Sequence, residues 1–123
     1  MSVNEEYSGK EKSKKLLGAV GLAARARKLI SGSEMCVETM RAGKGKLLII
    51  ASDVSENTRN KLVKTALFHK IPYMLADIDK AQLSNAAGKL SDSAAIILMD
   101  EGFVKIIEKL GAEIYTTDTE VLD

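Results

Sequence analysis

Residues 16–53 read LLGAVGLAARARKLISGSEMCVETMRAGKGKLLIIASD. Apolar side chains recur at helical spacing over residues 16–24, so we expect a helix from residue 10 to about residue 28. Gly32 interrupts this pattern, and Ser33 is a candidate cap for a second helix that reaches Arg41. The stretch thus predicts two helices joined by a sharp turn.

A short apolar run, KLLIIA at residues 46–51, follows a Gly-Lys loop. An uninterrupted run of this kind is typical of a strand that is covered on both faces. Working outward, we expect further helices at residues 55–69, 79–88 and 102–110, and further strands at residues 73–76 and 94–99. Strands that alternate with helices predict an α/β protein in which a small sheet lies between helical layers.

The chain has 123 residues, the usual length of one domain that can bury its own core. Residues 1–9 are polar without periodicity and are expected to form a flexible tail. Residues 10–112 are expected to form the single domain, and residues 113–123 an acidic C-terminal tail.

The formal net charge is only +1, but the charges are sorted along the chain. Residues 1–50 carry a net charge of +5 and residues 51–123 a net charge of −4. If the fold keeps the basic residues together, one face will have a positive potential that suits a polyanion. The alternative interpretation is that solvated helix faces happen to be basic in the first half.

One cysteine, Cys36, cannot form an internal disulfide, and the start MSVNEEYSG lacks the apolar segment of a signal peptide. The longest apolar runs, at residues 47–51 and 94–99, are far shorter than the ~20 residues of a membrane-spanning helix. We therefore expect a reduced, cytoplasmic protein without a membrane partner.

The sequence offers little for catalysis, a metal or a cofactor. His69 is the only histidine and falls at a predicted helix end, where a surface role is far more common than catalysis. Cys36 falls on the apolar side of a predicted helix, which indicates a buried side chain rather than a nucleophile. Neither a GxGxxG nor a phosphate-loop motif is present, and Asp100-Glu101 fits a helix start. We expect no enzymatic activity, no cofactor and no small-molecule substrate.

The basic residues suit RNA, because phosphates require only cations and backbone donors. No aromatic residue is interleaved with them in the sequence, so a stacking platform for single strands is not expected. Structured RNA is the remaining candidate, and DNA is not expected.

The chain resembles the kink-turn RNA-binding ribosomal protein superfamily, the L7Ae, L30e and S12e group, over about residues 16–110. Within it, the sequence looks most like the small bacterial YlxQ-type branch. The resemblance rests on these stretches: LLG at 16–18, LAARARKL at 22–29, Gly32, GKLLIIASD at 45–53, IPY at 71–73, Lys80 with Leu83, AAGK at 86–89, AII at 95–97 and DEGF at 100–103.

This resemblance implies a single-domain three-layer α/β/α sandwich with a small, mostly four-stranded mixed sheet. It also implies a non-enzymatic protein that binds a kinked RNA helix, with rRNA or the ribosome as a candidate partner. The helix start after Gly32 would read the RNA, and the loop at residues 90–93 would support a flipped-out base. The RNA-binding residues expected in this chain are Arg25, Arg27, Lys28, Gly32, Ser33, Glu34, Met35, Arg41, Lys44, Lys46, Lys80, Leu90 and Ser91.

The chain departs from the family pattern at Glu38, which occupies the position of a lysine in strong kink-turn binders. A carboxylate there would repel phosphate unless Arg41, one helical turn beyond, neutralises it. The alternative hypothesis is therefore a protein-interaction module that has kept the fold but no longer recognises kink-turn RNA. A substrate-binding domain of the kind attached to RNA methyltransferases is a weaker third hypothesis.

Overall fold

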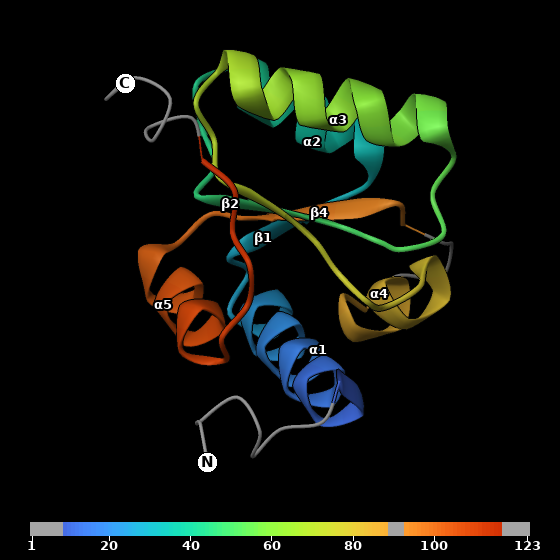
Figure 1. Cartoon of the computed structure of the whole chain (residues 1–123). Helices are drawn as coiled ribbons and strands as arrows, with labels where there is room; N and C mark the ends of the chain where they lie inside the picture. The colour runs from blue at the N-terminus through green and yellow to red at the C-terminus, as the bar shows by residue number, and fades with distance from the viewer. Residues whose placement is uncertain (1–8, 89–92, 117–123) are drawn as a thin grey trace.

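The computed structural model describes residues 9–88 and 93–116, which form five helices and a four-stranded sheet (Figure 1). The elements are α1 Gly9–Arg25, β1 Leu29–Ser31, α2 Ser33–Arg41, β2 Leu47–Ile50, α3 Glu56–Phe68, β3 Tyr73–Leu75, α4 Lys80–Ala86, β4 Ala95–Leu98 and α5 Glu101–Lys109. The tail was expected at residues 1–9, but α1 already begins at Gly9. Residues 1–8 and 117–123 and the predicted site residues Leu90 and Ser91 lie outside the described chain.

The sheet is mixed, with the strand order β1-β4-β2-β3. Strand β4 pairs antiparallel with both β1 and β2, whereas β2 pairs parallel with β3. Strands β1, β2 and β3 therefore all end at the edge of the sheet where β4 begins. This confirms the prediction of a small, four-stranded mixed sheet.

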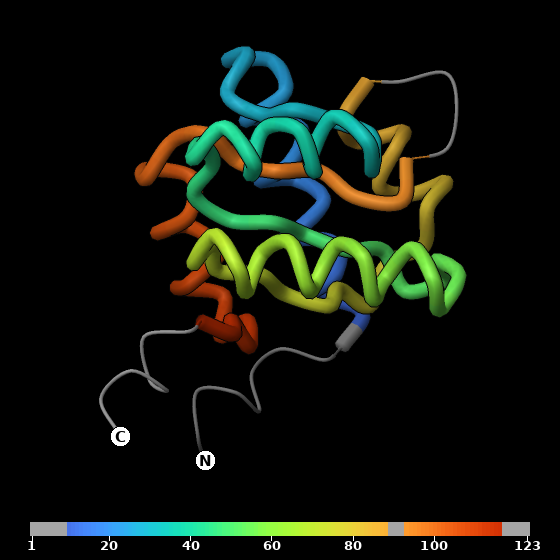
Figure 2. The backbone as a smooth tube through the Cα atoms, turned by 90° about the horizontal axis from the view of Figure 1, so that it is seen from above, coloured from blue at the N-terminus to red at the C-terminus, as the bar shows by residue number. Residues whose placement is uncertain are grey.

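Helices cover both faces of the sheet. Helices α2 and α3 lie side by side over one face, and α1, α4 and α5 cover the other (Figures 1 and 2). Successive residues of β2 alternate between the two cores: Leu48 and Ile50 face α2 and α3, whereas Leu47 and Ile49 face the other layer. All four side chains are fully buried, which confirms the strand and the three-layer α/β/α sandwich predicted from the sequence.

Side chains cap the starts of several helices. The Ser55 hydroxyl accepts a hydrogen bond from the Thr58 amide at α3, and Asp79 forms a capping box with Gln82 at α4. The expected cap of α2 is wrong, because Gly32 occupies the cap position and Ser33 is already helical. No side chain of the described residues caps α2, so its first amides stay open to a ligand.

Helix α1 ends at Arg25, three residues earlier than expected. Arg27 adopts the left-handed conformation, with φ of 59°, which stops the helix. The amides of Arg27 and Lys28 then donate to the carbonyls of Ala24 and Ala23, at 3.0 and 2.8 Å, as in a Schellman motif. Arg27 and Lys28 therefore lie in a turn rather than on the helix.

The packed chain continues past residue 112, where the sequence suggested that a tail begins. Tyr115 and Tyr73 exchange two backbone hydrogen bonds of 2.8 and 2.9 Å, and their rings stack with centroids 5.2 Å apart. Local sequence does not reveal this pairing, because the partner strand is about forty residues away.

Cys36 lies in the core between α2 and the sheet, as its place on the apolar side of the helix predicted. Its side chain is fully buried, and its Sγ lies 3.8 Å from the Ile30 carbonyl oxygen. Burial disfavours the thiolate and raises the pKa of Cys36 from 9.0 to about 12.

We expect the free energy of unfolding to fall as the pH rises above about 9. The unfolded thiol loses its proton near its ordinary pKa while the native thiol keeps it to about 12, so the native state binds more protons between these values. Between about pH 8 and about pH 10, wild type should lose about 1.4 kcal/mol more than Cys36→Ala in urea denaturation. Equal losses would show that Cys36 does not titrate in this window.

Candidate nucleic-acid interface

The register of β4 divides the predicted RNA-binding residues between two ends of the sheet. At one end the Gly32 amide donates to the Ala95 carbonyl at 2.9 Å. At the other end the Lys28 carbonyl accepts from the Met99 amide at 2.8 Å. Four strand residues separate Ala95 from Met99, a span of roughly 13 Å. We call these ends the Gly32 end and the basic end.

The basic end carries exposed cations from the turn after α1, the last residue of α2 and the loop before β2: Arg27, Lys28, Arg41, Lys44 and Lys46. The structure does not bring these cations to the start of α2. Helix α2 runs antiparallel to β1, so its first residue and its last residue lie at opposite ends of the sheet (Figure 1). Arg25 is set apart on α1, where its Nε lies 3.5 Å from the Gly21 carbonyl oxygen.

At the Gly32 end, the turn into α2 depends on glycine. Gly32 has φ of 106° and ψ of 136°, a conformation that is strained for any other residue. The first helical hydrogen bond runs from the Cys36 amide to the Gly32 carbonyl at 2.9 Å. The amides of Ser33, Glu34 and Met35 precede this bond and have no partner within the helix. Open amides of this kind at a helix start are a candidate site for an anion.

Two side-chain contacts hold neighbouring segments at the same end. The hydroxyls of Ser31 and Ser93 lie 2.6 Å apart and join the end of β1 to the start of β4. Asp53 Oδ1 accepts from the Lys80 amide at 2.7 Å and joins the turn after β2 to α4. The structure thus brings the segments of Gly32 and Lys80 to one end, whereas Leu90 and Ser91 lie outside the described residues.

Helix α3 adds two residues that the sequence analysis missed. Thr58 and Lys61 line a hollow of about 130 Å³ together with Ser33, Glu34 and Val37 of α2. The only local signal was an exposed lysine on a predicted helix. The proximity of Lys61 to the Gly32 turn depends on how α3 packs beside α2.

Glu38 lies among both carboxylates and cations. It lines a second hollow of about 130 Å³ with Glu34, Arg41 and Lys61. No hydrogen bond or ion pair joins Glu38 to Arg41 in the part of the chain that the structure describes. Lys61 therefore supplies a second positive charge beside Glu38, in addition to the arginine suggested by the sequence. The formal charges of the two carboxylates and the two cations at this hollow cancel.

One aromatic residue accompanies the cations, contrary to the expectation from the sequence. Phe68, the last residue of α3, lines a hollow with Arg41, Lys64, Thr65 and His69. Helix α3 brings this ring beside α2, although 27 positions separate Phe68 from Arg41 in the chain. The sequence order concealed this contact.

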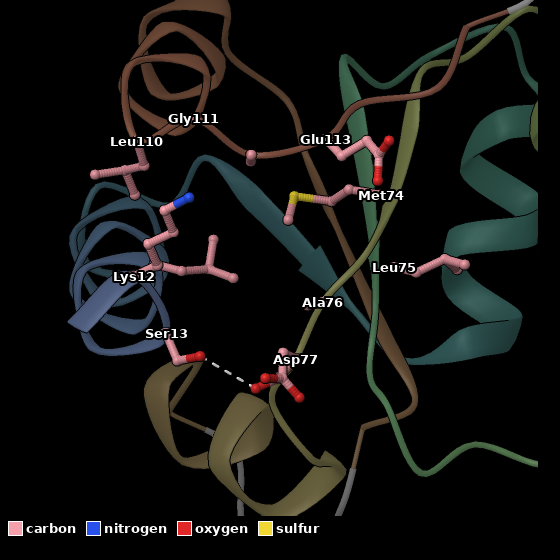
Figure 3. A pocket seen from close by; sticks show the side chains of 11 residues that line it. Lys12, Ser13, Met74, Leu75, Ala76, Asp77, Leu110, Gly111 and Glu113 are labelled. Carbon is pink, nitrogen blue, oxygen red and sulfur yellow. Dashed lines mark hydrogen bonds between the residues drawn. The ribbon is translucent and has the colours of Figure 1, made fainter. Parts of the chain in front are cut away.

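A separate apolar hollow of about 200 Å³ opens between α1, β3 and the segment after α5 (Figure 3). Its rim carries Lys12, Asp77 and Glu113, and the Ser13 hydroxyl donates to the Asp77 carbonyl at 3.2 Å. One lysine against two carboxylates does not favour phosphate. This hollow is therefore not part of the candidate interface.

The described helices include none that is long and apolar enough to cross a membrane. Within residues 9–88 and 93–116, no group of three or more His, Cys, Asp and Glu side chains is arranged to hold a metal ion. The arrangement that remains is a three-layer sandwich with an open helix start at one end and exposed cations at the other. It defines a small α/β/α protein with a candidate polyanion-binding edge.

Residues 14–108 match the Ribosomal protein L7Ae/L30e/S12e/Gadd45 family, and the chain belongs to this family. RNA-binding protein YlxQ of Bacillus subtilis is 33% identical over 92 residues, which cover 74% of this chain and 90% of that protein. RNA-binding protein YlxQ of Enterococcus faecium is 32% identical over 96 residues, which cover 78% and 90% of the two chains. The resemblance to the superfamily and to its YlxQ branch is thereby confirmed.

A solved structure of a protein of unknown function from Bacillus halodurans C superposes with a TM-score of 0.70. It is 33% identical in sequence, and the match covers 77% of this chain and 94% of that chain. The similarity in structure therefore extends over most of the sandwich.

Proposed function

We propose that this protein binds structured RNA without catalysing a reaction, and that a kinked RNA occupies the Gly32 end. The observation that carries this proposal is the uncapped start of α2 behind Gly32. Free amides and the positive end of the helix dipole attract phosphate there. Membership of a ribosomal protein family, and relatives that are named RNA-binding proteins, support RNA as the polyanion.

The described neighbours of this helix start suit an RNA ligand. Ser33, Glu34 and Met35 present backbone donors, and Lys61 of α3 supplies a cation beside them. Lys80 lies at the same end, where Asp53 fixes its backbone. In this proposal the loop that contains Leu90 and Ser91 contacts the same RNA.

The cations of the basic end bind the phosphates of an adjoining helical arm. A nucleic-acid strand in a duplex carries a phosphate about every 3.4 Å, so an RNA at the Gly32 end also presents phosphates roughly 13 Å away. These contacts add affinity without sequence information. We propose rRNA or another structured cytoplasmic RNA as the partner.

An electrophoretic shift with a kink-turn RNA and an unkinked duplex of the same length tests the proposal. We expect a shift of the kink-turn RNA at lower protein concentration than of the duplex, because only the kink fits the Gly32 turn. Both complexes should weaken as salt rises, since phosphate contacts release counterions. Equal affinity for the two RNAs would contradict kink recognition.

We expect Glu38→Lys to strengthen binding of the kink-turn RNA by roughly fivefold at low salt. The change replaces a carboxylate by a cation beside Arg41 and Lys61 and steepens the salt dependence. Glu108→Lys on α5 is the matched control, because it makes the same charge change on the other face of the sheet. A gain of the same size in both variants would indicate a general charge effect and argue against contact at Glu38.

Glu34 and Glu38 also favour a second candidate, a protein-interaction module of the same fold. Both carboxylates are exposed near the helix start, where they repel phosphate. The shift experiment separates the two functions. If micromolar protein at low salt shifts neither RNA, the protein-interaction function is the better explanation.

A further inference from the structure

Phe68 is the most exposed of the large hydrophobic side chains in the described chain. Its exposed fraction is 82%, although water disfavours a free benzyl ring. Only its ring contact with His69 is specific, with centroids 4.9 Å apart and planes at 81°. That edge contact fixes the orientation of the ring and leaves most of it open to a ligand.

The surroundings of Phe68 are cationic. The ring lines a hollow of about 300 Å³ at the C-terminal ends of α2 and α3, together with Arg41, Lys64, Thr65 and His69. No carboxylate is among these five residues. Glu38, one helical turn before Arg41, lines the neighbouring hollow instead. A ligand that suits the Phe68 hollow therefore has a planar or apolar part that contacts the ring and a negatively charged part that contacts the cations.

An unpaired nucleotide combines these two properties. Its base has a flat face that stacks on an aromatic ring, and its phosphate pairs with arginine or lysine. Thr65 adds a hydroxyl at the same hollow, although its own hydrogen already goes to the Lys61 carbonyl at 2.8 Å. Stacking accepts any base, so this hollow selects for single strands more than for sequence.

Three small hollows between α2 and α3 follow one another from the Gly32 turn to Phe68, the first two sharing Lys61 and the last two sharing Arg41. Thr58 and Lys61 lie beside Ser33, and Lys64 and Phe68 lie beside Arg41. Ten helical residues separate Thr58 from Phe68, which corresponds to roughly 15 Å. A strand that leaves a kinked RNA at the Gly32 end reaches Phe68 within a few nucleotides.

We infer that the hollow formed by Phe68, Arg41 and Lys64 binds an unpaired nucleotide of an RNA single strand, with its base stacked on the Phe68 ring. This inference deepens the proposed RNA-binding function and rests on it. The hollow adds a contact with unpaired RNA beside the basic end, with which it shares Arg41, and it is separate from the helix start at Gly32.

A hexauridylate RNA with one central 2-aminopurine tests the inference, because stacking quenches the fluorescence of that base. Addition of wild-type protein at low salt should quench the fluorescence as binding proceeds. Phe68→Ala should weaken binding roughly tenfold and abolish the quench. Phe68→Trp should keep both the binding and the quench of wild type, because tryptophan retains an aromatic face. Ile106→Ala on α5, at a side chain that is 40% exposed, is the matched control and should behave as wild type.

A blunt kink-turn RNA separates failure of this inference from failure of the proposed function. We expect Phe68→Ala to bind the blunt RNA as wild type does and to bind the hexamer weakly. Equal hexamer binding by Phe68→Ala and wild type, or no quench with wild type, would overturn the inference while leaving kink-turn binding intact. Failure of wild type with both RNAs would overturn the proposed function.

A fluorescent acidic peptide that contains one leucine completes the test. Binding of this peptide to wild type but not to Phe68→Ala, without binding of the hexamer, would assign the hollow to a protein partner and overturn the inference. The exposure of Phe68 predicts that Phe68→Ala folds normally, and circular dichroism checks this.

Discussion

Gly45→Ala should lower the free energy of unfolding by about 3 kcal/mol. Gly45 has φ of 107°, which strains any residue with a side chain. A Cβ at this position would lie 2.3 Å from Cδ1 of Ile97, and Ile97 is fully buried in the core under α2 and α3. Backbone strain and overpacking of the core therefore act together. Urea denaturation at neutral pH measures the loss.

Gly43→Ala is the matched control, two residues earlier in the same loop. Gly43 also has a positive φ, 76°, but a Cβ there would meet no atom within 4 Å. We expect this variant to lose only about 1 kcal/mol, which is the cost of the left-handed conformation alone. If the two variants lose equal stability, the contact with Ile97 contributes nothing.

Ser33→Asp should stabilise the protein and weaken its binding to kink-turn RNA. A carboxylate at the first position of α2 interacts favourably with the helix dipole and stabilises the folded protein by about 0.3–1 kcal/mol. The same charge lies where we propose that RNA phosphate approaches, so the affinity should fall roughly thirtyfold at low salt. Thermal unfolding and an RNA titration measure the two opposite effects.

Ser33→Asn is the control for this change, because asparagine has the shape of aspartate without its charge. We expect Ser33→Asn to bind RNA within about twofold of wild type, as only a charge should matter at this distance. A loss of affinity in Ser33→Asn equal to that in Ser33→Asp would mean that side-chain size, not charge, causes it. Unchanged affinity in Ser33→Asp would place the RNA elsewhere.

The elements of the fold other than β1 could be predicted because their signals are local. The run at residues 46–51 lacks polar alternation, and β2 is indeed covered on both faces. Ser55 and Asp79 cap the helices that follow them, as their side chains indicate. The end of α1 was missed because Arg27 adopts a conformation that the helical pattern of the sequence does not reveal.

The candidate site could be predicted only in part. Gly32 was singled out from the sequence, and the structure places it at an open helix start. The neighbours of that start were not predictable, because Lys61 and Lys80 reach the Gly32 end through the packing of α3 and α4. Phe68 was excluded from the cationic cluster for the same reason, since its contact with Arg41 links two different helices.

The sequence by itself determined the class of fold, the burial of Cys36 and the turn at Gly32. Hydrophobic periodicity, apolar runs and glycine all act on their near neighbours in the chain, so sequence is sufficient to detect them. Only the tertiary structure decided which charges lie together. Because strand β1 lies between them and pairs along β4, Lys28 and Gly32 lie at opposite ends of the sheet although four positions separate them in the chain. The stretch around Gly32 thus supplies both ends of the proposed RNA-binding edge.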